Sequence, residues 1–74
     1  MSKEMKIFVR LLNEDVDVWR PVLARHTHDN CYLIVDQAYD EEAETWEFGP
    51  GSAVICEPLS TAEGPILAAI RAVE

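Results

Sequence analysis

Runs of alternating apolar and polar residues, separated by turn sequences, are the feature that most constrains the fold of this chain. Over about residues 5–12, apolar side chains recur at every second position, and the polar residues 13–15 end the run. Two further turn sequences follow at residues 28–30 and 49–51. Alternation at period two is typical of a strand with one buried face, and Asn, Asp, Gly and Pro favour the backbone angles of tight turns. The pattern predicts an all-β fold.

The later runs predict further short strands. A second strand is expected over residues 16–24, interrupted at Pro21 because proline has no N–H to donate to a sheet. Three more strands are expected at residues 31–35, 45–48 and 52–57, followed by a loop over residues 58–64. The apolar residues 65–73 fit either a short helix or a last strand. We prefer the strand, because the last strand of a small barrel commonly lies beside the first.

The length of the chain limits how such strands can be arranged. With 74 residues, of which 49% are hydrophobic and 27% charged, we expect one domain over residues 1–74 with one small core. A meander that closes on itself leaves few exposed strand edges. The predicted fold is therefore a small β-barrel of five to six antiparallel strands. A core this small contributes little net stability, and pairing with a second copy as a homodimer would add to it.

Three segments of the chain resemble known small modules. They are VDVWRPVLA at residues 16–24, YLIV at residues 32–35 and WEFGPGSAV at residues 46–54. Together they resemble small bacterial proteins of unknown function and, more broadly, SH3-like modules of the Tudor and KOW type. The resemblance implies an SH3-like barrel. Tudor-like modules bind methylated basic side chains in aromatic cages and KOW-like modules bind RNA or ribosomal protein, but no cage aligns residue by residue with this chain.

The chain is strongly acidic, and its charge is unevenly distributed. Six basic and fourteen acidic residues give a net charge of -8. Residues 1–25 hold five basic and four acidic residues, whereas residues 26–74 hold one basic and ten acidic residues. Nucleic-acid binding depends on cationic side chains that displace counterions from phosphates, so a basic protein is the better electrostatic match. A nucleic-acid module would have to use the N-terminal basic residues Lys6, Arg10, Arg20 and Arg25.

The candidate binding residues are acidic and aromatic. Six acidic residues lie close together between two expected strands: Asp36, Asp40, Glu41, Glu42, Glu44 and Glu47. They form either a solvated hairpin tip or a docking surface for Lys and Arg side chains. Trp19 and Trp46 are either core side chains or binding anchors, and Arg20 can stack or pair beside Trp19. The residues expected to bind a partner are Trp19, Arg20, Asp40, Glu41, Glu42, Glu44 and Trp46.

Metal-ligating and nucleophilic side chains form one close group, His26, His28 and Cys31. Their spacing is not that of a zinc finger or ribbon, so we expect no metal and no cofactor. The same group invites a Cys-His nucleophile, but Cys56 lies in an apolar run and is expected to be a buried free thiol. The sequence contains no phosphate loop, nucleophile elbow or dinucleotide fingerprint. We therefore expect no enzymatic activity.

Taken together, these features predict a non-enzymatic interaction module. No run of about 20 apolar residues is present and residues 1–6 are largely polar, so a cytoplasmic location with no membrane contact is expected. The acidic residues 36–47 would contact a basic protein, for example as an inhibitor or immunity-type protein that blocks the cationic site of a nuclease. The alternatives are a self-associating structural domain that pairs through residues 65–73, and the nucleic-acid module described above.

Overall fold

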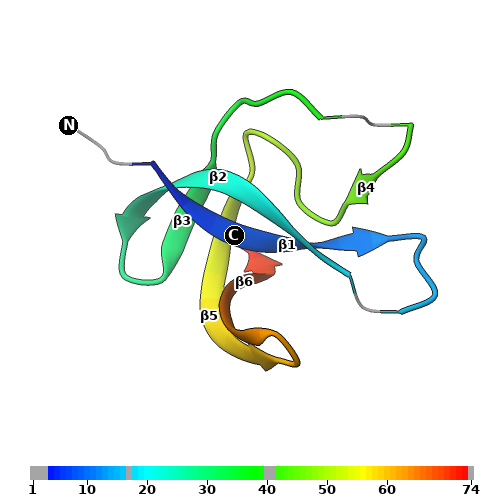
Figure 1. Ribbon diagram of the computed structural model, residues 1–74. Coiled ribbons are helices and arrows are strands. Elements are labelled where there is room, and N and C mark those ends of the chain that lie inside the picture. Colours follow the sequence, from blue (N-terminus) through cyan, green and yellow to red (C-terminus); the bar gives the residue numbers. More distant parts are fainter. Residues whose placement is uncertain (1–3, 17, 40–41, 74) are drawn as a thin grey trace.

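The structure, a computed structural model, describes residues 4–16, 18–39 and 42–73 and places six strands in them (Figure 1). These are β1 (Glu4–Leu12), β2 (Trp19–His28), β3 (Cys31–Ile34), β4 (Thr45–Trp46), β5 (Ala53–Thr61) and β6 (Gly64–Ala72). Within these three ranges no residue is helical, and no helix could cross a membrane. The all-β expectation is confirmed, and residues 65–73 are a strand up to Ala72 rather than a helix.

Five of the strands form a near-closed ring. β1 pairs with β2, β2 with β3, β3 with β5 and β5 with β6, each time antiparallel. β6 then returns to β1 at one pair, Phe8 with Ala68, which is parallel. Four successive reversals of direction leave β6 running the same way as β1, so an up-and-down ring of five strands closes on a parallel pair. The expectation of antiparallel strands throughout is wrong at this closing pair.

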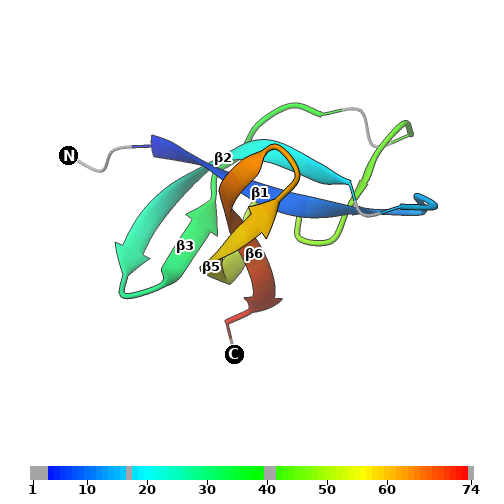
Figure 2. The same cartoon turned by 60° about the horizontal axis from the view of Figure 1, so that its bottom comes forward.

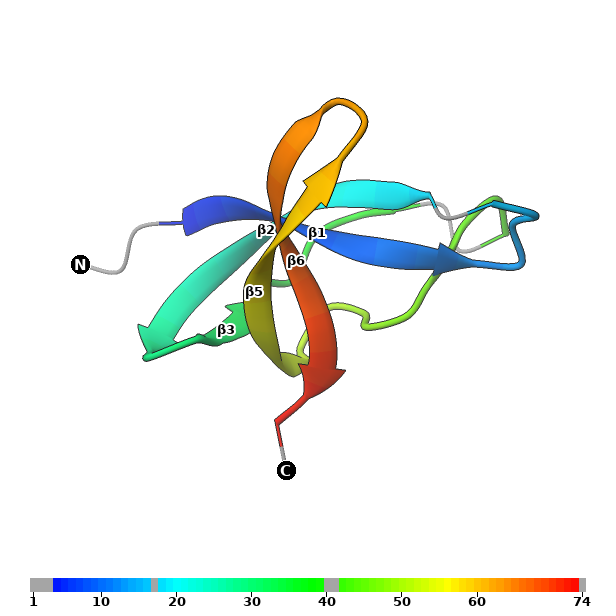
Figure 3. The ribbon, with the colours of Figure 1, turned by 90° about the horizontal axis from the view of Figure 1, so that it is seen from below.

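Only one residue pair among the described residues joins β6 to β1 and closes the ring. Figures 2 and 3 show the β5–β6 hairpin crossing β1 and β2, with its tip projecting beyond them. β4 lies outside the ring and pairs with the end of β1, Leu11 with Trp46 and Leu12 with Thr45. In Figure 1, β4 and the hairpin tip lie on opposite sides of the two-stranded ribbon made by β1 and β2. The two sides of this ribbon therefore meet different parts of the chain.

The core comes from side chains that alternate along the strands. In β1, Ile7 and Val9 are fully buried while Lys6 and Arg10 are exposed, which confirms the period-two pattern. The complete cluster of buried residues is Ile7, Val9, Val22, Ala24, Ile34, Trp46, Val54, Cys56 and Ala69. Each of the five ring strands contributes to it. Burial of this apolar surface is the main stabilising contribution to the fold.

Two prolines lie inside strands that the sequence pattern ends or interrupts. β2 runs through Pro21, which pairs with Phe8, and β5 runs through Pro58, which pairs with Leu67, so the expected break and the expected loop at residues 58–64 are both wrong. Backbone groups in a strand alternate in direction. The N–H of Leu23 points away from β1, to the Gln37 side chain, and the N–H of Cys56 points away from β6, to Asn30 O.

β2 and β5 therefore accommodate their prolines for the same reason. Pro21 lies two residues from Leu23 and Pro58 lies two residues from Cys56, so in each case the position of the absent N–H faces away from the partner strand. On that side β3 pairs with β2 only from Ala24 on and with β5 only as far as Ile55. Proline is accepted where the strand has a free edge.

The turns at Asn13 and Asp29 lie where residue type predicted them, whereas several strands begin or end at other residues than expected. Asn13 and Asp29 have positive φ values of 64° and 48°, in the left-handed region that Asn and Asp tolerate. The β5–β6 turn is shorter than the expected loop, because Thr61 pairs directly with Gly64. Gly64 has φ 120°, a conformation that a side chain would strain. The expected strand at residues 45–48 is reduced to β4.

Candidate binding surface

Trp46 is a core side chain. It is 7% exposed, and the pairing of β4 with the end of β1 places it in the core cluster. Its indole ring stacks on Tyr39, with ring centroids 4.0 Å apart, and its Nε1–H donates a hydrogen bond of 2.9 Å to Glu44 Oε1. Of the two roles that the sequence left open for this tryptophan, the structure shows the core role.

Glu44 connects this buried indole to β2. The same Oε1 atom that accepts the Trp46 hydrogen bond lies 3.2 Å from Arg20 Nε. The side chains of Arg20 and Glu44 are 46% and 27% exposed, so solvent screens the ion pair and its contribution to stability is small. The carboxylate of Glu44 is engaged within the molecule, and it ties the segment before β4 to the first residues of β2.

The acidic segment, residues 36–47, is only partly described. Asp40 and Glu41 lie outside the described residues. Asp36, Glu42 and Glu47 are exposed, whereas Glu44 is half-buried. The acidic residues expected to act together therefore divide into exposed carboxylates and one inward carboxylate that supports Trp46.

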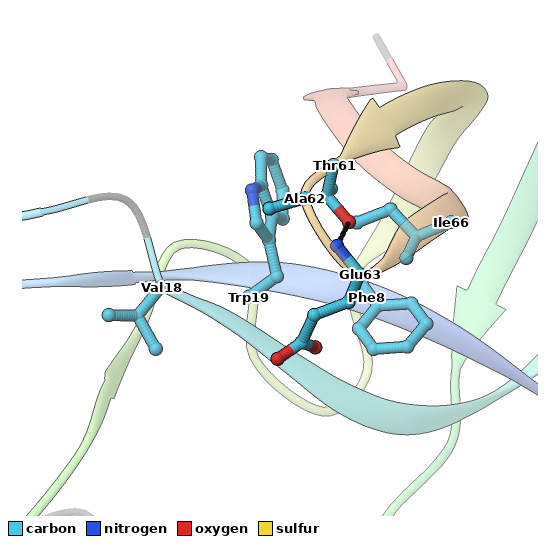
Figure 4. A pocket seen from close by; sticks show the side chains of 7 residues that line it. All are labelled: Phe8, Val18, Trp19, Thr61, Ala62, Glu63 and Ile66. Carbon is cyan, nitrogen blue, oxygen red and sulfur yellow. Dashed lines mark hydrogen bonds between the residues drawn. The ribbon is translucent and has the colours of Figure 1, made fainter.

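Trp19 has a different environment. It is half-buried and lines a pocket of about 360 Å³ together with Phe8 of β1 and Ile66 of β6 (Figure 4). The other lining residues are Val18, Thr61, Ala62 and Glu63. Arg20 has the same strand parity as the buried Val22, so Trp19 faces the other side of the ribbon. We call this cavity the Trp19 pocket.

The Trp19 pocket exists because the ring closes at one pair. β6 pairs with β1 only at Phe8 and Ala68. Beyond that pair the tip of the β5–β6 hairpin projects past β1 and β2 and no longer pairs with them. The space between them is lined by outward-facing side chains of β1 and β2 on one side and by the turn of the hairpin on the other (Figure 4). Thr61 Oγ1 donates a 2.6 Å hydrogen bond to Gly64 O and accepts one of 3.3 Å from the Glu63 N–H. These bonds hold the turn that carries Glu63.

The group of His26, His28 and Cys31 is spread over two paired strands. His26 pairs with Tyr32 and His28 with Cys31, with an irregularity between the two pairs. His26 Nε2 lies 2.6 Å from Asp29 O, and its ring lies 4.9 Å from the Tyr32 ring. In the described part of the chain, no three His, Cys, Asp or Glu residues are grouped so that they could hold a metal ion.

The two cysteines are free thiols in different environments. Cys31 is half-buried, whereas Cys56 is 1% exposed in the core. Burial raises the pKa of the Cys56 thiol from 9.0 to about 11, and the nearby Cys31 adds to the increase. Because the thiolate is the nucleophile, a thiol with this pKa reacts slowly near neutral pH. Cys56 is a core side chain.

Sequence reasoning missed Gln37, whose side chain hydrogen-bonds to the edge of β2 just beyond the last residue pair between β2 and β3. Its Oε1 accepts the Leu23 N–H at 3.0 Å, and its Nε2 donates to Leu23 O at 2.9 Å and to Val35 O at 2.8 Å. An amide side chain carries the same donor and acceptor as a peptide group, which makes this pairing possible. Sequence reasoning also missed Phe8, Glu63 and Ile66 as neighbours of Trp19. It predicted a loop over residues 58–64, where the structure has the β5–β6 hairpin.

Comparisons with protein-family models, with curated proteins and with solved structures found no match to this chain. The resemblance of residues 16–54 to SH3-like modules therefore has support from the fold only at a coarse level, as a small all-β domain with ring-like pairing.

Proposed function

We propose that this chain is a non-enzymatic interaction module, built as a small SH3-like barrel, that binds a basic protein with Trp19 as its anchor. The observation that carries the proposal is the contrast between the two tryptophans. Trp46 is enclosed in the core, whereas Trp19 is half-buried over a pocket on the outside of the ring. Tryptophan is enriched among the residues that contribute most to binding energy, and these residues cluster in pockets near the centre of an interface.

The ring supports the barrel part of the proposal. Five strands paired in a ring, which returns to β1 at one residue pair, are the arrangement from which a small barrel is built. The longest connection, between β3 and β4, carries all the acidic residues of the acidic segment except Glu47.

Charge supports a basic partner. The net charge of -8 attracts cationic surfaces, and most of the acidic residues follow residue 25. Arg20, the residue after Trp19, pairs with Glu44, so this residue of the acidic segment lies at the same end of β2 as the Trp19 pocket. A partner that wraps around this end of β2 contacts both.

Affinity capture with two matched variants tests the proposal. The parent protein is used at low salt against a lysate of the cells that produce it, with elution by a salt gradient and mass spectrometry. The test variant carries Asp40→Lys, Glu41→Lys and Glu42→Lys, which leaves the structural Glu44 intact. The control carries Glu14→Lys, Asp15→Lys and Glu57→Lys, the same charge change elsewhere. We expect one or two basic proteins that the parent and the control retain and the test variant loses. Equal capture by all three would contradict the role of the acidic segment.

Self-association is a second candidate with an observation of its own. Ile70 of β6 and Val73, the residue that follows β6, are 43% and 39% exposed and lie close together in the sequence. Pairing of two copies across this end of β6 would cover them. Sedimentation over a hundredfold range of protein concentration tests it, since a dimer gives a mass that rises with concentration and that Ile70→Ser lowers to the monomer value.

A further inference from the structure

Prolines lie on free strand edges in this fold. Pro21 of β2 and Pro58 of β5 both face away from their partner strand, as described above. Pro65 of β6 pairs with Ser60, which lies two residues from Pro58, so its missing N–H also faces away from the partner strand. A proline on a free edge cannot donate a hydrogen bond to another strand. These edges are therefore protected against pairing with another chain.

The second half of β6 has a free edge without a proline. β6 meets β1 only at Ala68, and Figure 3 shows the strand then leading away from β1 and β2. The Val73 N–H donates to Ala53 O before β5 begins to pair with β6, and backbone groups alternate in direction, so the N–H and C=O of Ala72 face away from β5. Among the described residues no strand pairs with β6 on that side after Ala68. Ala72 thus offers a donor and an acceptor to another chain.

The side chains next to this edge are apolar and exposed. Arg71 pairs with Ile55 and Ala69 with Cys56, so Ile70 has no partner on β5. Ile70 and Val73 are both more than a third exposed. A strand added along this edge would remove part of this apolar surface from water, which favours its binding.

Charge favours a second copy of this chain as the added strand. Two copies that each carry a net charge of -8 repel one another over their acidic parts. β6 contains no acidic residue and one basic residue, Arg71, so repulsion is weaker along this strand. Antiparallel pairing about a twofold axis also offers each copy the same donors and acceptors, which makes the edge complementary to itself.

We infer that two copies of this chain pair as antiparallel strands along the free edge of β6 after Ala68. This inference rests on the self-association candidate of the proposed function and names the backbone groups that make the contact. Ile66 lines the Trp19 pocket, and Ala72 lies six residues, or about 20 Å, further along β6. The pairing therefore leaves the Trp19 pocket of each copy accessible.

Amide exchange with solvent tests the inference on the full chain. Nuclear magnetic resonance measures the exchange rates of the Ala72 and Val73 N–H groups at the two ends of the concentration range used for sedimentation. We expect the Ala72 N–H to exchange at least about tenfold more slowly where the dimer forms. The Val73 N–H, bonded to Ala53 O within each copy, is the reference and should change much less. A dimer in which Ala72 exchanges at its monomer rate would overturn the inference.

A proline substitution tests the same N–H. Ala72→Pro removes the group that faces the second copy and leaves the pairing with β5, as Pro21 and Pro58 do in their own strands. The dissociation constant of the dimer should rise at least about tenfold, because each copy loses one hydrogen bond. Ser60→Pro makes the matching change on the free edge of β5 and should leave the constant nearly unchanged. Equal weakening by the two variants would argue against the edge of β6.

The failure of strand pairing can be told apart from the failure of self-association. A monomer at every concentration would contradict both, and the acidic interaction module would stand. A dimer that Ile70→Ser dissociates and Ala72→Pro leaves intact would keep self-association and contradict strand pairing, since contacts of side chains alone would then hold the two copies together.

Discussion

The two tryptophans show how differently this small fold uses the same side chain. Trp46 has a satisfied indole N–H, a stacked tyrosine and little exposure, whereas Trp19 is half-buried above a pocket on the other side of the β1–β2 ribbon. On one side β4 pairs with the end of β1 and brings Trp46 into the core, and on the other the turn of the β5–β6 hairpin lines the pocket with Trp19. In this domain, incomplete closure of the ring separates an enclosed aromatic residue from one that is left half-buried.

Replacing each tryptophan by alanine should give the largest difference between the two sides. Trp46→Ala should lower the free energy of unfolding by about 3–5 kcal/mol, because it leaves a cavity in the core and removes the partner of Glu44. Trp19→Ala should lower it by about 1 kcal/mol, the usual effect of a substitution away from the core. Urea unfolding followed by circular dichroism measures both values. Similar losses for the two variants would remove the contrast between the two tryptophans.

The two cysteines, like the two tryptophans, differ in burial, and the buried Cys56 should make the stability of the fold depend on pH. At pH values below about 9 the Cys56 thiol is protonated in both the folded and the unfolded chain. Between pH 9 and 11 the unfolded chain loses this proton while the folded chain keeps it, because burial raises the pKa to about 11. The free energy of unfolding should therefore fall across this window, by roughly 3 kcal/mol.

The variant Cys56→Ala isolates this contribution from other groups that titrate at alkaline pH. Its free energy of unfolding should be less dependent on pH than that of the parent between pH 9 and 11. Cys31→Ala, at the half-buried thiol, should keep most of the pH dependence, because burial is the larger cause of the raised Cys56 pKa and Cys31 only adds to it. Parallel pH profiles for the parent and Cys56→Ala would show that Cys56 is open to solvent.

The link between Trp46 and β2 should give the smallest effects. Arg20→Met should lower the free energy of unfolding by about 0.5 kcal/mol, because the ion pair with Glu44 is partly exposed. Glu44→Ala should cost more, about 1–2 kcal/mol, because it leaves the Trp46 indole N–H without its acceptor. Glu44→Gln keeps an acceptor and should resemble Arg20→Met. The three values come from the same urea titrations, and an equal cost for Glu44→Ala and Glu44→Gln would argue against the indole hydrogen bond.

Local patterns predicted the parts of the fold that depend on neighbouring residues. The alternation in β1 indicated correctly that Ile7 and Val9 are buried, and residue type indicated the turns that contain Asn13 and Asp29. The preference for a strand after Gly64 is also confirmed. The prolines misled the same reasoning, because whether a strand tolerates a proline depends on which of its edges is free.

The candidate site was predictable only in part. Trp19 was identified from its residue type, but the same reasoning gave Trp46 an equal chance of binding, and the two differ only in what the fold packs around them. Glu63 was placed in a loop with no role. Its position beside Trp19 follows from the hairpin and from the one pair that joins β1 to β6.

The sequence by itself determined that this chain is acidic, all-β and divided by turns, because charge, period-two alternation and turn angles are properties of residues and their near neighbours. The tertiary structure alone decided which tryptophan is enclosed, which strand edges accept proline and which side chains surround the Trp19 pocket. The physical reason is that strand order and ring closure bring together residues far apart in the chain, and no local pattern records which strands will be neighbours.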